Sequence, residues 1–183
     1  MGMRVGPTFD VTAPEHLQAH HDVSAFSNGK HLSLDAWLKE RALRSEGLSA
    51  RTYVICKLSA PTRVVGYYAI STAMEERLSL PSAKMRRGMP DQVPLLLIGR
   101  LALDTSLHGR RLGADLLADA VRRCCAASQI VGARAIVAHA IDEEAAHFYR
   151  HHGFLFSPLG ERTLLLPIET ARAAIGIGGR DRD

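Results

Sequence analysis

The sequence predicts an α/β (α+β) fold with a mixed central sheet flanked by helices, because strands and helices alternate through its second half. Residues 95–104 are almost continuously apolar, which is typical of a strand covered on both faces. From there the expected order is β-α-β-α-β-β, and the strands on either side of the first helix are expected to be parallel. The later elements are a helix entered at 109–114 and ending near Ser128, a strand over 134–141, a helix over 143–152, and a strand pair over 154–157 and 162–168.

The first half of the chain is expected to contain one helix and a hairpin. Ser33 is placed to cap a helix over residues 33–45. The apolar residues that share one face of it are Leu34, Trp37, Leu38 and Ala42. Residues 52–59 and 63–72 are rich in Val, Ile and Tyr and predict two strands, joined by a turn at 60–62.

A length of 183 residues fits one domain with a real core. Three prolines, Pro81, Pro90 and Pro94, predict that residues 73–94 are mostly loop. We expect a single domain over residues 1–175. The remaining residues, 176–183, are rich in Gly, Arg and Asp and are expected to be a disordered tail.

The sequence predicts cytoplasmic residence. The longest apolar runs, such as residues 95–98 and 135–138, are far too short to span a bilayer. Asp10 and Glu15 fall where a signal peptide would need an apolar segment. The adjacent Cys124 and Cys125 lie in a helical pattern, where cysteine behaves as a small apolar residue.

The positive charge is concentrated in the middle of the sequence. Between Arg77 and Arg123, nine Lys and Arg residues stand against four Asp and Glu, giving +5, whereas the other fourteen and fifteen give −1. This excess favours a polyanionic partner, either cofactor phosphates or nucleic acid. A solvated basic face without a partner is the alternative.

The turn between the strand at 95–104 and the next helix is a candidate anion site. Gly109 and Gly113 permit positive φ, and the N–H groups at a helix start attract negative charge. Arg110 and Arg111 add charge there. The turn is neither a P-loop nor a dinucleotide fingerprint, because the required Gly and Lys spacing is absent. A purely structural helix start remains open.

Tyr149 is the candidate proton donor. It lies one turn from Ala145 and Ala146, whose small side chains leave room over that face of the helix. A phenol at such a gap can act as a general acid, although a packed aromatic with a surface hydroxyl gives the same pattern. His147 and His151 have the i, i+4 spacing of metal ligands, but no carboxylate or Cys pattern completes a site, so no metal is expected.

Together these two segments resemble the GNAT acetyltransferases. The pattern is strand, Arg/Gln-x-x-Gly-x-Gly/Ala loop, helix, strand, then Ala-x-x-Phe-Tyr-x-x-x-Gly-Phe, and the last part stands here at 145–154. The resemblance covers about Val64 to Ile168. Aligned on Gly113, the family's Gln/Arg falls on His108 and its first Gly on Arg111, so Arg111 must adopt the backbone conformation of a glycine.

The GNAT resemblance implies acetyl-CoA as co-substrate and no metal. It implies that the tyrosine matching Tyr149 protonates the departing thiolate after an amine attacks the thioester. It also implies that the strand pairs with the pantetheine arm and that the loop holds the pyrophosphate. The implied cofactor-binding residues are Leu101, Ala102, Leu103, His108, Gly109, Arg110, Arg111, Leu112, Gly113, Ala114 and Phe148.

The N-terminal half narrows the resemblance to the TacT-like toxins of bacterial type II toxin–antitoxin systems. Residues 25–38, AFSNGKHLSLDAWL, are similar to the "Phe-x-Cys/Ser-Gly … Leu-Asp-x-Trp-Leu" opening of these proteins. Segments 51–55, 65–69 and 99–104 also look like theirs, so the match runs from about Phe9 to Ile168.

The narrower resemblance implies acetylation of the α-amine of aminoacyl-tRNA, which blocks translation. It also implies a homodimer and a ribbon-helix-helix type antitoxin as partner. An α-amine has a pKa near 7.7–8.0, so no strong general base is needed. The residues expected to hold tRNA phosphates are Lys30, Arg77, Lys84, Arg86, Arg87 and Arg100.

Two alternatives remain open. The first is a housekeeping GNAT N-acetyltransferase that acts on a protein N-terminus, a polyamine or another small amine. The basic 77–123 region argues against a polyamine, which would need an acidic pocket. The second is a GNAT-fold binding module without catalysis, which the intact Tyr149 argues against.

Overall fold

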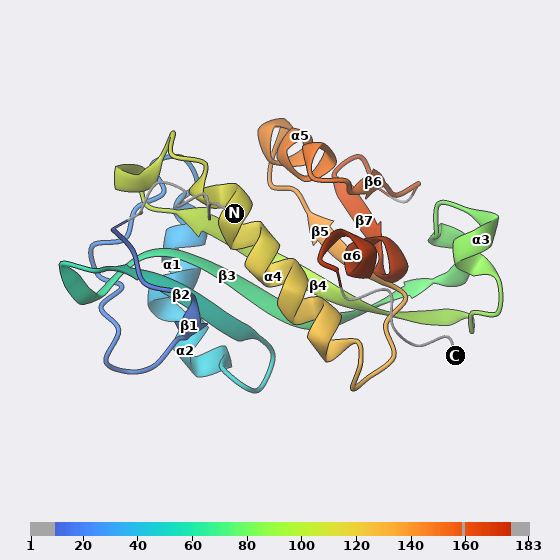
Figure 1. Ribbon diagram of the computed structural model, residues 1–183, viewed down its shortest axis with the longest axis horizontal. Coiled ribbons are helices and arrows are strands. Elements are labelled where there is room, and N and C mark those ends of the chain that lie inside the picture. Colours follow the sequence, from blue (N-terminus) through green and yellow to red (C-terminus); the bar gives the residue numbers. More distant parts are fainter. Residues whose placement is uncertain (1–9, 159, 177–183) are drawn as a thin grey trace, which may run out of the picture. The chain divides into compact units, whose positions relative to one another are not determined.

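Figure 1 shows the computed structural model, which describes residues 10–158 and 160–176. The chain forms two compact units, one up to Tyr67 with Ala102–Leu112 and one of Tyr68–Leu101 with the residues from Gly113 on. The described residues form a seven-stranded sheet with the order β1-β2-β3-β4-β5-β7-β6. Its strands are β1 (Glu15–His16), β2 (Arg51–Lys57), β3 (Ala60–Glu76), β4 (Gln92–Leu103), β5 (Ala135–His139), β6 (Leu155–Phe156) and β7 (Thr163–Pro167).

In the first unit, two helices replace the single helix predicted over 33–45. They are α1 (Leu32–Glu40) and α2 (Ala42–Ser45), and Arg41 between them has φ −121° and ψ −32°, outside the helical region. The cap is His31, not Ser33. The helix starts early because the Asn28 side chain accepts the N–H groups of Lys30 and His31 and ends a tight turn there.

The hairpin turn of the first unit lies at Leu58 and Ser59, not at 60–62. Pro61 is therefore the second residue of β3, near the strand start, where a missing N–H is tolerated. The core of this unit surrounds Tyr67, which packs edge-on against Phe26 with 5.5 Å between ring centroids. Its buried members are Leu17, Phe26, Leu38, Ala42, Val54, Cys56, Val64, Tyr67 and Ala102.

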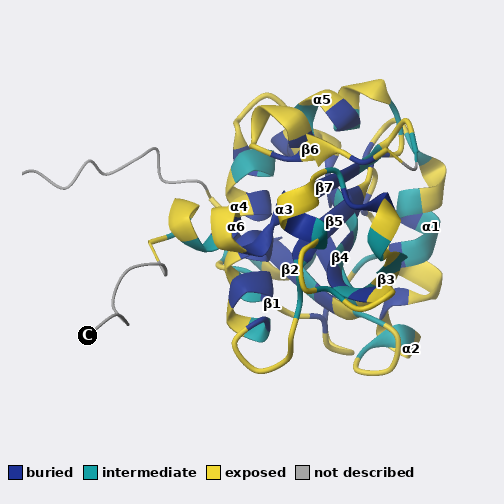
Figure 2. Cartoon of the chain, turned by 90° about the vertical axis from the view of Figure 1, so that its right-hand side faces the viewer, coloured by how far each residue is buried: buried dark blue, intermediate teal, exposed yellow. Residues whose placement is uncertain are grey.

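The second unit confirms the predicted parallel strands. β4 and β5 pair in parallel from Leu95 with Ala135 to Ile98 with Ala138. β7 pairs antiparallel with both β5 and β6, so it lies between them although β6 precedes it in sequence. β5 and β7 are largely buried and β6 is exposed, whereas the helices expose one side (Figure 2). The buried core residues are Leu80, Met85, Val93, Leu95, Ala135, Val137 and Leu165.

Three helices complete the second unit. α4 (Leu112–Ala127) and α5 (Glu143–His151) lie where the sequence predicted helices. α6 (Ile168–Ala174) was not predicted, because the apolar run into Ile168 reads as continued strand. Pro167, its N-cap, cannot donate a backbone hydrogen bond, and the chain turns into the helix there.

The stretch 73–94 contains more regular structure than the prolines suggested. β3 continues to Glu76, a 3-10 turn η1 spans Arg77–Ser79, and helix α3 spans Ala83–Arg86. Pro81 and Pro90 lie between elements, as predicted, but Pro94 lies inside β4. Proline has no N–H to donate, but its carbonyl oxygen can still accept, and that of Pro94 accepts the Arg134 N–H.

Among the described residues, no helix is long and apolar enough to cross a membrane. The tail predicted to be disordered lies outside the described residues, apart from Gly176.

Candidate active site

Asp104 fixes the start of the candidate anion loop in the first unit. It follows β4 and caps the 3-10 turn η2 (Thr105–Leu107), accepting from the Ser106 N–H at 3.0 Å. Its other oxygen accepts from the Ser27 N–H at 3.0 Å. Burial raises the pKa of Asp104, but the hydrogen bonds from Ser106 and Ser27 outweigh it and leave the pKa below its usual value. A carboxylate at this position therefore joins the end of β4 to the turn before α1.

Arg111 adopts the glycine-like backbone that its alignment with the GNAT loop predicted. Its φ is +58°, and it is the one non-glycine residue of the described chain with positive φ. Gly109 also has positive φ, +77°, in the same loop. A left-handed conformation costs an L-residue about 1–2 kcal/mol, so this loop is held in a strained shape.

The strained loop leads directly into α4, which begins at Leu112. The first N–H groups of a helix have no partner within the helix and carry partial positive charge. Arg110 and Arg111 are exposed, and neither side chain has a hydrogen-bond or ion-pair partner among the described residues. The His108 ring instead donates to the Leu103 carbonyl over 3.0 Å. The loop can attract a phosphate through N–H groups and two free guanidinium groups.

The second candidate segment is α5, whose ends are fixed by local signals. Asp142 caps the helix by accepting the Ala145 N–H at 2.8 Å, and Gly153, with φ +93°, ends it. Tyr149 is 6% exposed, and its ring packs against Phe154 with 5.3 Å between centroids. The ring is therefore held rigidly in the second unit.

The Tyr149 hydroxyl has no hydrogen-bond partner among the described residues. Two other buried tyrosines differ, because Tyr67 donates to the Leu34 carbonyl and Tyr68 to the Asp119 carboxylate. Burial raises the Tyr149 pKa, so the phenol keeps its proton at neutral pH.

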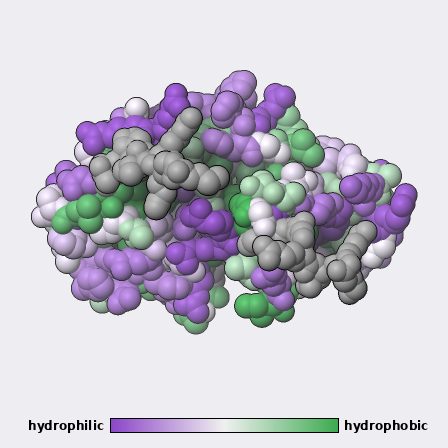
Figure 3. Space-filling view, in the orientation of Figure 1, coloured by the Kyte–Doolittle hydropathy of each residue, from purple (hydrophilic) through white to green (hydrophobic). Residues whose placement is uncertain are grey.

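A shallow cavity of about 640 Å³ lies along the outer side of α5. Its lining includes Phe148, the predicted cofactor contact next to Tyr149. Hydrophilic residues gather over this helix in Figure 3, in agreement with its exposed charged side chains. The lining residues are Glu144, His147, Phe148, Arg150 and His151.

Two of the predicted RNA-binding residues have structural partners in the second unit. Arg77 pairs with Asp91, with 3.0 Å between nitrogen and oxygen. Arg86 donates to the Leu80 carbonyl over 2.9 Å. Both bonds stabilise the stretch around α3, so these guanidinium groups are less available to a ligand than the sequence suggested.

Lys84 and Arg87 differ from that pair. Both are exposed on or beside α3, and neither side chain forms a hydrogen bond or ion pair with another described residue. Arg100 lies in β4 of the same unit, whereas Lys30 lies in the turn before α1 of the first unit. Lys84 and Arg87 are thus exposed cations of this stretch, and the charge of Lys84 also acts on the Glu169 carboxylate of α6.

Sequence analysis missed the Asp119 network on α4. The carboxylate accepts from the Tyr68 hydroxyl and pairs with Arg122 at 3.1 Å and Arg123 at 3.0 Å. The i, i+3 and i, i+4 spacing of these charges was the available signal. The single Asp119 carboxylate therefore balances one of these two arginine charges.

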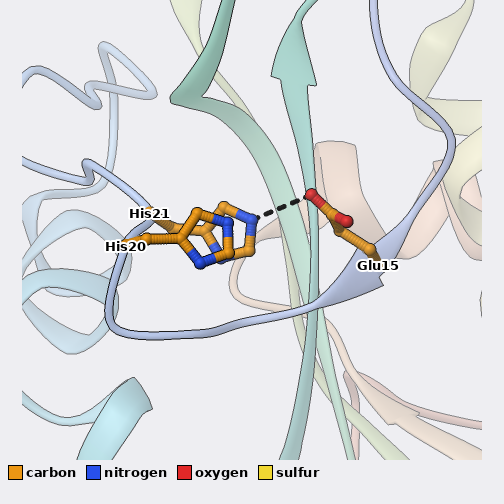
Figure 4. A group of neighbouring side chains, drawn as sticks. All are labelled: Glu15, His20 and His21. Carbon is orange, nitrogen blue, oxygen red and sulfur yellow. Dashed lines mark hydrogen bonds and ion pairs between the residues drawn. The ribbon is translucent and has the colours of Figure 1, made fainter.

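Glu15, His20 and His21 form the one group of potential metal ligands found among the described residues (Figure 4). His21 Nδ1 accepts the Gln18 N–H at 2.8 Å, so its proton must be on Nε2, which donates to Glu15 at 2.9 Å. Both ring nitrogens of His21 are therefore in use, and this cluster is a structural brace for the first unit.

The mixed α/β fold, the exposed arginines before α4 and the protonated Tyr149 are each features expected of an N-acetyltransferase of the GNAT class. The chain is 41% identical over 166 residues to the tRNA-acetylating toxin of Mycobacterium tuberculosis, a match that covers 90% of this chain and 97% of that protein. No protein-family model matches the sequence. At this identity and coverage, the chain belongs to the family of tRNA-acetylating GNAT toxins.

Solved structures agree. The crystal structure of a tyrosine-to-phenylalanine mutant of KacT has a TM-score of 0.84 and 28% identity, over 91% of this chain and 99% of that one. AtaT complexed with acetyl-methionyl-tRNAfMet has a TM-score of 0.81 and 30% identity, over 92% of this chain and 98% of that one. The mixed α/β fold expected from the sequence is thereby confirmed.

Proposed function

We propose that this protein transfers the acetyl group of acetyl-CoA to the α-amine of aminoacyl-tRNA and thereby blocks translation. The observation that carries the chemistry is Tyr149, which is buried on α5 and whose phenol keeps its proton at neutral pH. The substrates are supported by relatives, since AtaT has been solved with acetyl-methionyl-tRNAfMet and AtaTR with acetyl-CoA. Residues 1–175 act together as one GNAT domain.

The proposed reaction needs one positioned acid. The neutral amine attacks the thioester carbonyl, and the tetrahedral intermediate then expels the coenzyme thiolate. Tyr149 donates its phenolic proton to that sulfur, and the proton lost by the new ammonium restores the phenol through solvent. A thiol has a pKa near 8.5, so the departing thiolate can take up the phenolic proton and leave as the free thiol. The acetyl group passes directly to the amine, without an acyl-enzyme. The three cysteines are buried and take no part.

The loop after β4 is the proposed site of the coenzyme diphosphate. Exposed Arg110 and Arg111, the strained backbone and the first N–H groups of α4 have the chemistry that a diphosphate requires. Leu101, Ala102 and Leu103 at the end of β4 are the proposed partners of the pantetheine amides. Phe148 remains a proposed contact on α5.

The proposed partners follow from the same relatives. AtaT has been solved bound to the C-terminus of the antitoxin AtaR, and KacTA with DNA. We infer a small antitoxin of the ribbon-helix-helix type, a homodimeric toxin and a cytoplasmic location, where charged tRNA is found.

The deciding experiment is incubation with radiolabelled acetyl-CoA and charged total tRNA. The expected result is label in the acetyl-aminoacyl-adenosine released by nuclease, and loss of that label in the Tyr149→Phe variant. Label that enters only protein N-termini or small amines in a parallel reaction would overturn the tRNA assignment and favour a housekeeping acetyltransferase. No labelled product of any kind would overturn the enzymatic proposal.

A further inference from the structure

Helix α3 and the residue after it carry two exposed cations, Lys84 and Arg87, and the helix is too short to be stable alone. It has four residues, Ala83–Arg86, whereas isolated helices need about 12–15 residues to be even marginal. Ser82 caps it by accepting the Met85 N–H at 3.2 Å. Met85 is buried in the core of the unit, and Lys84 precedes it on the exposed side. Something else must fix the direction in which the helix points.

Arg134, just before β5, supplies that constraint. Its Nε–H donates to the Met85 carbonyl at 3.0 Å. Its two terminal nitrogens hold the Glu169 carboxylate of α6 at 2.7 and 3.3 Å. The Arg134 side chain is only 11% exposed. One guanidinium thus connects α3, the start of β5 and α6.

The Arg134 backbone is equally constrained. Its N–H donates to the Pro94 carbonyl at 2.8 Å, and its carbonyl accepts the Ile168 N–H at 3.1 Å. The side chain therefore extends from a point fixed on both sides by β4 and the start of α6. A helix end held by such a bond cannot turn without breaking a partly buried, charge-assisted contact.

We propose that Arg134 is a positioning residue for tRNA, which holds α3 so that Lys84 and Arg87 present their charges to the phosphate backbone. This inference rests on the proposed tRNA substrate. Arginine is required because its planar fork serves a carbonyl and a carboxylate at once, whereas lysine has no Nε–H at that position. Arg134 touches neither the proposed acid nor the loop after β4.

The test is a double-mutant cycle between Arg134→Lys and the pair Lys84→Gln/Arg87→Gln, read as KM for aminoacyl-tRNA. Each should raise that KM about 5- to 10-fold, with kcat and acetyl-CoA affinity within about twofold of the wild type. The variant that combines all three substitutions should have the same KM for aminoacyl-tRNA as Lys84→Gln/Arg87→Gln. Once the two cations are gone, the position of α3 no longer affects tRNA binding. The slope of log affinity against log salt should also fall by about 1–2 in Arg134→Lys, as two phosphate contacts are lost.

The matched control is Arg172→Lys. Arg172 lies on α6 like Glu169, is partly buried and donates to Ser128 at 2.9 Å, but has no bond to α3. It should leave KM for tRNA unchanged. Additive effects in the cycle, an unchanged salt slope or an equal loss of acetyl-CoA affinity would each overturn the positioning role.

The failure of this inference can be distinguished from failure of the proposed function. If the wild type acetylates aminoacyl-tRNA while Lys84→Gln/Arg87→Gln has wild-type KM, only the role of α3 is wrong. If the wild type does not acetylate aminoacyl-tRNA, both are wrong.

Discussion

Tyr149 is a buried phenol that keeps its proton, which suits an acid better than a base. Burial disfavours the charged phenolate and raises the pKa of the group. A base would have to lose its proton near neutral pH, so this environment excludes that role. The same ring is fixed by Phe154, which follows the helix stop at Gly153.

Tyr149→Phe should lower kcat by about 10²–10⁴-fold, the usual contribution of a general acid, because the departing thiolate then has no proton donor. Acetyl-CoA affinity, measured by calorimetry, should stay within about twofold, since the ring is retained. Phe148→Leu is the neighbouring control and should lower coenzyme affinity more than kcat. Unchanged turnover in Tyr149→Phe would remove this residue from the mechanism.

The pH profile of kcat gives a second prediction for the same residue. An ordinary tyrosine titrates near pH 10, and the pKa of Tyr149 is raised above its usual value. The acid should therefore stay protonated through pH 10, and kcat should stay level between pH 8 and about 10. A loss of half the activity by pH 10 in a still-folded enzyme would contradict the raised pKa.

Arg111→Gly should stabilise the protein, by about 1 kcal/mol, because it removes the cost of a left-handed L-residue. Urea unfolding followed by circular dichroism measures this change. Arg110→Gly is the matched control, since Arg110 has no positive φ and should gain nothing. A gain of equal size in both variants would mean that lost charge, not backbone strain, is the cause.

At the scale of elements, α4 is held to β3 by a charged network. Tyr68, Arg122 and Arg123 converge on Asp119. Burial raises the pKa of this carboxyl, but the hydrogen bonds outweigh it and leave it below its usual value. A carboxyl with a lowered folded-state pKa stabilises the fold above its unfolded pKa of about 3.9 and loses that contribution as pH falls further.

Asp119→Asn should therefore lower the free energy of unfolding by about 1–3 kcal/mol at pH 7. The difference from the wild type should shrink as pH falls below about 4. Denaturation at several pH values measures it, with the exposed Asp115→Asn on the same helix as control. A difference independent of pH would show that packing rather than ionisation is responsible.

Two adjacent arginines at the end of α3 differ in their surroundings. Arg86 is bonded to the backbone, whereas Arg87 is exposed. Arg86→Ala should lower thermal stability, because it removes the bond to the Leu80 carbonyl. Arg87→Glu should leave stability nearly unchanged and raise KM for aminoacyl-tRNA in a salt-dependent way. Thermal melts and acetylation assays at two salt concentrations measure both, and the reverse assignment would contradict this division.

At the scale of the whole molecule, the features that could be predicted are those that depend on local sequence signals. The parallel β4–β5 pair, the limits of α5 and the left-handed Arg111 could all be predicted from periodicity, caps and the loop motif. The break at Arg41 and helix α6 could not be predicted, since tertiary contacts override propensity there.

In the candidate site, too, some features could be predicted from the sequence and others could not. Tyr149 and the loop carry motifs, but the bonds of Asp104, Asp119 and Arg134 join residues 35 to 77 positions apart, or depend on burial. No spacing rule predicts the long-range bonds from Asp104 to Ser27, from Tyr68 to Asp119 or from Arg134 to Glu169. The sequence therefore indicates the residues that we propose for the chemistry, but not the contacts that hold them in place.

The position of β7 between β5 and β6 has a consequence for synthesis. β5 pairs with β4 on one side, and its antiparallel neighbour on the other side exists only after Thr163–Pro167 has been made. Until then that side of β5 is an unpaired edge, and parallel or distant pairings form slowly. A nascent chain that ends before β7 should therefore lack a finished second unit. The enzyme becomes competent only once β7 has joined the sheet.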